Sequence, residues 1–428
     1  TLVPRILDDA VNLGMDVFPQ LTKDPDAYIF ESLKHGWDPH LGAWRAIEAD
    51  LEECWNGDPI GWSHMDSIDT DPELCLPDET WVETFARRER VEDLRGQISK
   101  GEIREVNGLI THNLNSEKLL TDVIAECDDA AVLEDLWGAV SNLKIIDPTC
   151  GSGAFLFAAL EVLEVFYGNL LDRLGGLKEE AVTMQEMKRH PNRRYFLRKH
   201  AALRNLFGAD IMPDAIETAK LRIFLALASC LETKSQLEPL PDLDFNLKVG
   251  NLVVGFVNSA DVARVEDGRL IIDNQLEDIE ESMADHIGLY EAFVSASSEN
   301  GAAAQRAKVV LQESELRLRA AADEYYAECT GKDANEYGAW AQEARPFHWS
   351  IEFPAVFANG GFDVVIGNPP YIKKSEVPAV TRQSMIGFKS QGLPDFYAVC
   401  LERSDQLRNM RSRKAMIVML SLAFSAGF

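Results

Sequence analysis

The chain has 428 residues, 46% of them hydrophobic, and a net charge of −28, so it can bury a core of more than one domain but disfavours contact with a polyanion unless basic residues gather locally. No run of about eighteen apolar residues predicts a membrane span, and the start of the chain has no signal-peptide pattern. The seven cysteines include no C-x-x-C pair and no neighbouring histidine cluster, which argues against a zinc site or disulfide framework and predicts a reducing, cytoplasmic location.

Residues 1–105 are acidic and contain stretches with helical spacing, such as Leu41–Leu51. Turn-forming residues at 57–61 and 69–72 divide this region into short helices. The pattern predicts a helical accessory region, to which we assign no chemistry.

From residue 106 onward, short apolar runs alternate with longer helical patterns. The pattern predicts helices at 154–174 and 213–231, and strands at 143–146, 206–209, 245–249, 362–366 and 415–419. Such alternation predicts an α/β fold, in which helices cover both faces of a mostly parallel sheet and ligands bind beyond the carboxyl ends of the strands. An Ala-, Glu- and Arg-rich stretch at about 276–345 predicts a helical hairpin inserted into this domain.

The most informative motif is Asp147-Pro-Thr-Cys-Gly-Ser-Gly-Ala-Phe155, which lies between a predicted strand and a predicted helix. Its Gly-x-Gly turn allows the backbone to approach a ligand closely, and the acidic residue at the strand end can bind a cationic amino group. The Gly-x-Gly-x-x-Gly spacing of dinucleotide sites is absent. Asp210, at the end of the second strand, can accept hydrogen bonds from both hydroxyls of a ribose; Asp214 is the competing residue for this role.

A second motif, Asn368-Pro-Pro-Tyr371, follows the strand predicted at 362–366. Its prolines fix the backbone and leave rigid carbonyl groups. The Asn368 side-chain oxygen and the Pro369 carbonyl can accept both hydrogens of an exocyclic amino group, while Tyr371 stacks on the ring that carries it. The loop therefore suits a planar amine as substrate.

Asp-Pro-x-Cys-Gly-Ser-Gly-x-Phe resembles the first, cofactor-binding motif of adenine-N6 DNA methyltransferases. The order of the two motifs is like that of type IIG restriction–modification methylases and of the methylases of BREX and DISARM phage defence. The resemblance implies a Rossmann-like class I methyltransferase domain over residues 106–428, S-adenosylmethionine as cofactor, and a flipped-out adenine in double-stranded DNA as target. In these relatives a target-recognition region follows the catalytic domain, so we expect this chain to be a piece that stops before it.

The resemblance also implies the residues of the site. Asn251 stands where many relatives carry Asp, and Thr111 matches a segment whose usual Pro is replaced by His112. The expected catalytic residues are Asn368, Pro369, Pro370 and Tyr371, and we expect no metal ligands. The expected cofactor-binding residues are Thr111, Asp147, Pro148, Cys150, Gly151, Gly153, Phe155, Asp210, Ile211 and Asn251.

Two basic clusters are candidates for contacts with DNA phosphates. Lys373 and Lys374 lie directly beside the substrate motif, whereas the cluster at 188–199 is more typical of a solvated helix face. Other subunits of a restriction or phage-defence complex are expected partners, and a membrane is not. Two alternatives remain open at this point: a methyltransferase acting on a protein glutamine or an RNA base, and a non-catalytic DNA-binding or assembly subunit of a defence complex.

Overall fold

The computed structural model describes residues 1–35, 75–178, 181–236, 240–258, 264–266, 269–271, 274–299, 302–330, 334–385 and 387–419. These residues form two compact units, one of residues 6–128 and one of residues 1–5 and 129–428. The observed boundary, between Asp128 and Asp129, lies further along the chain than the expected one at 105/106. The helix predicted at 41–51 and the turns after it lie outside the described residues.

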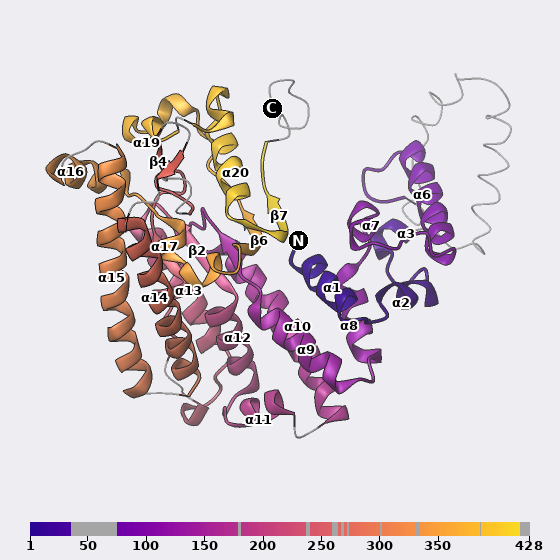
Figure 1. The fold of residues 1–428 in the computed structure, drawn as a ribbon. Coiled ribbons are helices and arrows are strands. Elements are labelled where there is room, and N and C mark those ends of the chain that lie inside the picture. Colours follow the sequence, from indigo (N-terminus) through magenta and orange to yellow (C-terminus); the bar gives the residue numbers. More distant parts are fainter. Residues whose placement is uncertain are drawn as a thin grey trace, which may run out of the picture. The chain divides into compact units, whose positions relative to one another are not determined.

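Helices form the unit of residues 6–128 wherever it is described (Figure 1). Its longest helix begins after Thr80, whose hydroxyl accepts a hydrogen bond from the Glu83 N–H while the Glu83 carboxylate accepts one from the Thr80 N–H. This capping box satisfies backbone donors that the first turn of a helix leaves free. The helices are α1 (Leu2–Asn12), which begins in the other unit, α2 (Val17–Lys23), α3 (Glu31–Lys34), α6 (Trp81–Ser99), α7 (Val106–Thr111) and α8 (Ser116–Glu126).

The larger unit is built on a five-stranded parallel sheet in the order β3-β2-β1-β6-β7. The strands are β1 (Ile145–Asp147), β2 (Leu206–Asp210), β3 (Leu247–Val249), β6 (Phe362–Gly367) and β7 (Arg408–Met416). The predicted α/β fold is therefore confirmed, with four of the five strands within a few residues of their expected positions.

The fifth strand was placed wrongly. We expected it over the apolar residues 415–419, whereas β7 runs from Arg408 to Met416. Its first residues are polar and partly exposed, and Met410 is fully exposed. Because β7 pairs only with β6 among the described strands, its outer side needs no apolar alternation, and charged residues are favoured on such an edge.

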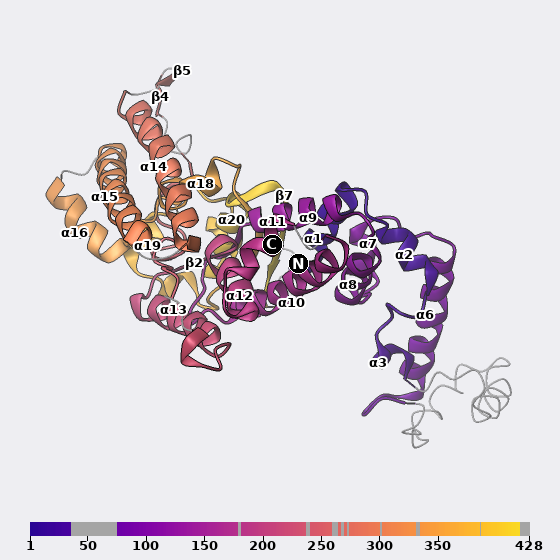
Figure 2. The same cartoon turned by 90° about the horizontal axis from the view of Figure 1, so that it is seen from below.

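Helices cover both faces of the sheet (Figure 2). Alternate residues of each strand face opposite sides, so Ile146, Phe207 and Val365 share one buried cluster with residues of α17, α18 and α20. On the other face, Leu156 of α10 lies so close to Gly208 that a Cβ there would stand 2.9 Å from its Cδ1. The first set is α17 (Trp349–Glu352), α18 (Pro354–Phe357) and α20 (Phe396–Gln406), and the second is α9 (Ala130–Asn142), α10 (Ala154–Leu177), α12 (Arg193–Arg204) and α13 (Pro213–Ala228).

One helix, α10, is long and apolar enough to cross a membrane by length and composition alone, which the sequence analysis did not anticipate. Nine of its residues, among them Leu156, Leu160 and Leu163, are buried. It contacts β1, β2, α9 and α12, so these apolar residues have partners inside the sheet domain. The shorter elements are α11 (Val182–Lys188), η1 (Lys234–Gln236), η3 (Lys374–Glu376), α19 (Ala379–Gln383) and η4 (Lys389–Gly392).

A long insertion separates β3 from β6. It contains the antiparallel strands β4 (Arg264–Glu266) and β5 (Arg269–Ile271), followed by α14 (Asn274–Glu299), α15 (Ala302–Thr330) and α16 (Ala334–Ala344). The helices correspond to the insertion predicted at about 276–345, and the short β4–β5 pair was not predicted. After α16 the chain returns beside the point where it left the sheet, because the Phe347 and Trp349 N–H groups donate to the carbonyls of Val254 and Phe256.

A buried ionic network fastens α15 to the sheet. Lys248 of β3 lies 2.6 Å from Glu315 and 3.1 Å from Glu352, and Arg319 lies 2.6 Å from Glu352. The two cations hold the pKa of Glu352 at about 2, although burial alone would raise it. The insertion is therefore anchored by charges that have lost their water and depend on one another.

Candidate active site

The carboxyl ends of β1 and β6 lie side by side in the middle of the sheet. The chain builds the sheet outward from β1 in one direction through β2 and β3, and in the other direction through β6 and β7. A crevice between diverging loops is expected at such a topological switch point. The loop after β1 carries the Asp147–Phe155 motif, and the loop after β6 carries Asn368–Tyr371, so the fold brings the two predicted motifs together.

The glycine-rich turn after β1 has a backbone that other residues would not readily adopt. Gly151 has φ +50° and Gly153 has φ +75°, both in the left-handed region. A Cβ on Gly153 would also stand 2.9 Å from the Cβ of Ala219 on α13. The turn is held to β2 by a hydrogen bond of 3.0 Å from the Cys150 N–H to the Ala209 carbonyl.

Asp147 is the residue best placed to meet a cationic ligand. It is buried, one carboxylate oxygen accepts from the Thr149 N–H at 3.1 Å, and the other has no hydrogen-bond partner. Burial raises the pKa of Asp147 to about 7, and the negative charge of Asp210 adds to the effect. A buried carboxylate oxygen without a partner is unfavourable unless a ligand supplies a donor, so this residue fits a ligand that carries an ammonium group.

Two further residues beside Asp147, Thr149 and Gly367, were not predicted from the sequence. The Thr149 hydroxyl is buried and likewise has no hydrogen-bond partner. A Cβ on Gly367, the last residue of β6, would stand 2.9 Å from Asp147 Oδ1 and 3.5 Å from Thr149 Oγ1. Their positions in the sequence could have indicated them. Thr149 lies inside the first motif, and a glycine at the end of β6, directly before Asn368, allows a close approach of the two loops.

Asp210 ends β2 beside the glycine-rich turn. One carboxylate oxygen accepts from the Gly151 N–H at 2.9 Å and the other from the Met212 N–H at 2.9 Å. Asp210 therefore fixes the turn, and each oxygen keeps a lone pair for a ligand hydroxyl. Ile211, which follows it, is 42% exposed and offers an apolar surface at the strand end.

Asn251 is buried and engaged by the protein. Its amide nitrogen donates to the Ala344 carbonyl at 3.2 Å and to the Thr381 hydroxyl at 3.1 Å, while its side-chain oxygen accepts from the Val253 N–H. The expected contact with the cofactor's adenine stays a prediction. The geometry gives Asn251 a second task, because it joins the end of α16 to α19.

Arg345 lies next to Asn251 and was also not predicted. It has φ +49°, unusual for a residue with a side chain, and its carbonyl accepts from the Asn251 N–H. Its guanidinium group donates to the Ile211 carbonyl. Arg345 thus bridges the residues that follow β2 and β3 at the edge where ligands are expected.

The substrate loop presents an amide and an aromatic ring. Asn368 is exposed and Tyr371 is 45% exposed, whereas Pro369 is buried. The Tyr371 hydroxyl lies 2.5 Å from Asn368 Oδ1 and 2.7 Å from the Ile417 carbonyl. A phenol donates one hydrogen, so these two acceptors compete for it. Buried Tyr397 lies edge-on to the Tyr371 ring, with 6.2 Å between ring centroids.

Three other predicted cofactor residues stand in or beside the glycine-rich turn. Pro148 and Cys150 are buried, and Phe155 lies half-buried in the first turn of α10. Burial raises the pKa of the Cys150 thiol far above its usual range, which is unsuited to a nucleophile. Thr111 ends α7 in the unit of residues 6–128, where its hydroxyl donates to the Asn107 carbonyl. Its role in cofactor binding stays a prediction.

The lysines beside the substrate loop have protein partners. Lys373 lies 2.6 Å from Asp395, and the Lys374 ammonium group donates to the Gln391 carbonyl. In the cluster at 188–199, Arg194 and Arg198 both bind Glu164 of α10, and Arg193 lies 2.6 Å from Asp172. Phosphate contacts by Lys373 and Lys374 therefore stay a prediction. To bind a phosphate, each ammonium group would have to leave its protein acceptor or bind both groups at once.

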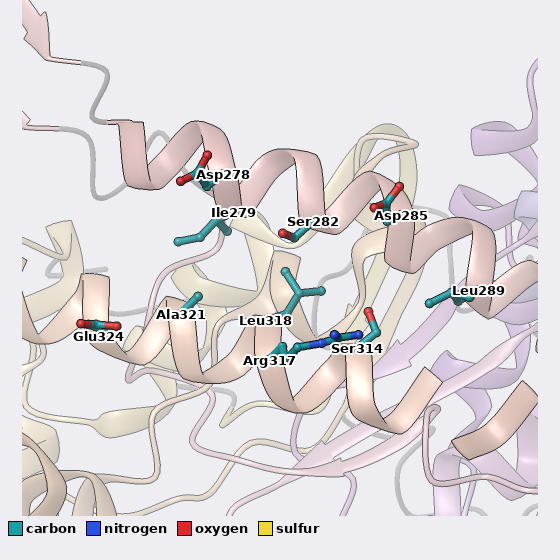
Figure 3. A pocket seen from close by; sticks show the side chains of 10 residues that line it. All are labelled: Asp278, Ile279, Ser282, Asp285, Leu289, Ser314, Arg317, Leu318, Ala321 and Glu324. Carbon is teal, nitrogen blue, oxygen red and sulfur yellow. The ribbon is translucent and has the colours of Figure 1, made fainter. Parts of the chain in front are cut away.

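A groove of about 550 Å³ lies between α14 and α15 (Figure 3). Three carboxylates and one guanidinium group line it together with apolar and hydroxyl groups, and none of its residues belongs to the strand-end loops. We assign the candidate site to the crevice at β1 and β6 because the unpartnered Asp147 oxygen and the two motifs are there. The residues of the groove are Asp278, Ile279, Ser282, Asp285, Leu289, Ser314, Arg317, Leu318, Ala321 and Glu324.

A protein family and a curated relative are similar to parts of this chain. A family model described as Eco57I restriction-modification methylase matches residues 204–427, which include β2, Asn251 and the substrate loop but not the turn after β1. A protein of Methanocaldococcus jannaschii, named as a type II restriction enzyme and methyltransferase, is 25% identical over 313 residues, which are 60% of this chain and 24% of that protein. Because the family model matches more than half of the chain, the chain belongs to the Eco57I restriction-modification methylase family.

Proposed function

We propose that this chain transfers a methyl group from S-adenosylmethionine to the N6 amino group of a flipped-out adenine in DNA. The observation that carries the proposal is the close approach of the two loops: a Cβ on Gly367, directly before Asn368, would stand 2.9 Å from Asp147 Oδ1. Membership of a restriction-modification methylase family supports DNA as the substrate.

The cofactor-side residues fit the proposed ligand. The free Asp147 oxygen would accept from the ammonium group of the methionine end, and the remaining lone pairs of Asp210 would accept from the ribose hydroxyls. Exposed Ile211 would lie against the adenine ring. S-adenosylmethionine supplies a methyl carbon that is activated by a positively charged sulfur, so the protein's contribution is alignment.

The substrate-side residues would position the target amine. The Asn368 oxygen and the Pro369 carbonyl would accept its two hydrogens and direct the nitrogen lone pair toward the methyl carbon. In this arrangement the amine nitrogen would bond to the methyl carbon as the carbon–sulfur bond breaks, and one amine proton would pass to water. In this state Asn368 Oδ1 is occupied by the target amine, so the Tyr371 hydroxyl would donate to the Ile417 carbonyl instead.

Mutation of Asn368 tests the proposal. Asn368→Ala should nearly abolish methyl transfer to duplex DNA and leave the Kd for S-adenosylmethionine almost unchanged, because Asn368 faces the amine. Tyr371→Ala should lose stacking worth about 1–3 kcal/mol per base, and Tyr371→Phe should keep it. Radiolabelled methyl transfer and isothermal titration calorimetry measure the two quantities.

The product distinguishes the alternatives. Mass spectrometry of digested nucleosides should find N6-methyladenine in the DNA. Methylcytosine as the product, or normal methylation by Asn368→Ala, would overturn the assignment. Methylation of RNA or of a protein glutamine without DNA methylation would favour the other substrate classes, and failure of the wild-type protein to bind S-adenosylmethionine would favour a non-catalytic subunit.

A further inference from the structure

One of the basic segments of this acidic chain lies next to the substrate loop. Residues 371–394 contain four basic residues and one acidic residue, so their formal charge is +3 in a chain of net charge −28. A locally positive surface on a negative protein concentrates the attraction for a polyanion at one place and repels it elsewhere. The segment therefore offers positive charge for contact with DNA although the net charge of the chain is negative.

The segment is folded as one piece beside the site. The Lys373–Asp395 bridge and the Lys374 N–H, which donates to the Pro394 carbonyl, close its two ends. In its middle, Thr381 of α19 accepts a hydrogen bond from Asn251. Residues that follow Thr381 are therefore held at the edge of the sheet that carries both motifs.

Two cations of this segment differ from the neighbouring lysines. Arg382 and Lys389 are exposed, and neither has an ion-pair partner among the residues that the structure describes. The Glu402 carboxylate nearby accepts from the Lys389 N–H, the Ser390 N–H and the Ser390 hydroxyl, and not from the Lys389 ammonium group. Lys373 and Lys374, in contrast, hold the ends of the segment together.

We propose that Arg382 and Lys389 bind DNA phosphates and hold the DNA backbone beside the target adenine. The inference rests on the proposed function and adds to it the surface that the DNA occupies. Lys373 and Lys374 then serve chiefly to shape the loop that carries Arg382 and Lys389. Phosphate contacts are ionic and independent of sequence, so this surface sets how strongly and in what salt the domain binds any duplex.

Salt dependence of DNA binding measures these contacts directly. The full chain is titrated against a labelled duplex of mixed sequence between about 50 and 200 mM salt, and the slope of log K against log salt is compared between variants. Arg382→Ala/Lys389→Ala should reduce the slope by about 0.9 for each lost contact and weaken binding at 0.1 M salt by roughly tenfold per contact. Arg382→Lys should keep the wild-type slope, since it keeps the charge.

Arg189→Ala is the control for each single variant, Arg382→Ala and Lys389→Ala, because Arg189 is an exposed cation just after α11 and its substitution likewise removes one positive charge. It should leave the slope unchanged. A wild-type slope and affinity in the double variant would overturn the inference, as would an equal loss in Arg189→Ala. Methylation of DNA by the wild-type chain at low salt is scored separately, so failure of the proposed function is distinguishable from failure of this surface.

Discussion

At the scale of single residues, Asp147 couples ligand binding to pH. Its folded pKa of about 7 lies above its ordinary value of 3.8, so between these pH values the folded protein binds a proton that the unfolded chain has lost. The stability of the free protein should therefore fall as pH rises from about 4 to about 7. A ligand ammonium group would favour the ionised carboxylate and reverse this penalty.

We predict that S-adenosylmethionine binds more tightly as pH rises from about 6 to 8, with an affinity that increases by up to about tenfold per pH unit below the pKa of Asp147. Binding should also release a proton. Calorimetry in buffers of different ionisation enthalpy measures both effects. Asp147→Asn should bind weakly and without this pH dependence. A pH-independent wild-type Kd would separate Asp147 from the ligand's cationic group.

Asn251 shows why a departure from a motif needs the structure for its explanation. The resemblance places Asp there in many relatives, but here the side-chain amide donates to the Ala344 carbonyl, which a carboxylate cannot do. We predict that Asn251→Asp lowers the free energy of unfolding by about 1–3 kcal/mol, because it leaves a buried carbonyl facing a negative charge.

Urea denaturation measures this loss. Asn359→Asp is the control, since Asn359 is exposed and also donates to a backbone carbonyl, that of Ala355. It should cost less than about 0.5 kcal/mol. An Asn251→Asp protein as stable as the wild type would show that the Ala344 contact contributes little.

At the scale of secondary-structure elements, the anchoring of α15 depends on the buried ionic network. Replacing Glu352 by Gln leaves Lys248 and Arg319 with Glu315 as their remaining shared carboxylate. We predict that Glu352→Gln lowers the free energy of unfolding by about 1–3 kcal/mol, the usual cost of lost hydrogen bonds to a charged group. Thermal denaturation followed by circular dichroism measures it.

A second substitution makes this test specific. Lys248→Met combined with Glu352→Gln should recover part of the loss, because the buried ammonium group is removed together with its partner. Additive losses in the double variant would mean that the two groups act independently. The network should also weaken as pH falls toward about 2, since the folded pKa of Glu352 lies below its ordinary value of 4.5 and its contribution is lost on protonation.

The strands of the sheet differ in how well the sequence predicts them. β1, β2, β3 and β6 are central or covered strands, so their apolar residues reveal them. β7 is an edge strand whose polar residues hide it, and only pairing with β6 identifies it. The two motifs were recognisable because their residue types are dictated by local chemistry, whereas Thr149, Arg345 and Gly367 matter through neighbours that are distant in sequence.

At the scale of the whole molecule, the division into two units predicts how the chain unfolds. Asp147, Asp210 and Asn251 all belong to the unit of residues 1–5 and 129–428, whereas Thr111 belongs to the unit of residues 6–128. Ligands stabilise the part of a protein that binds them, by RT ln(1 + [L]/Kd).

We predict two transitions in differential scanning calorimetry, of which S-adenosylmethionine raises only the one that belongs to the larger unit. At a ligand concentration of about 100 times Kd, this stabilisation is about 2.7 kcal/mol. Asp210→Ala should abolish the shift. A ligand-dependent shift of both transitions would instead indicate that the smaller unit takes part in binding, as the prediction for Thr111 requires.

The return of the chain after α16 has a consequence for engineering. Residues 251–257 and 345–350 run side by side and are joined by backbone hydrogen bonds, so both ends of the insertion are fixed at one place whatever lies between them. Lengthening a loop whose ends are already held costs little, about 0.6 kcal/mol per doubling. This position is therefore suited to the insertion of a reporter or of another helical domain. Such a chimera should keep Lys248, which would remain the ion-pair partner of buried Glu352 after Glu315 and Arg319 are removed with α15.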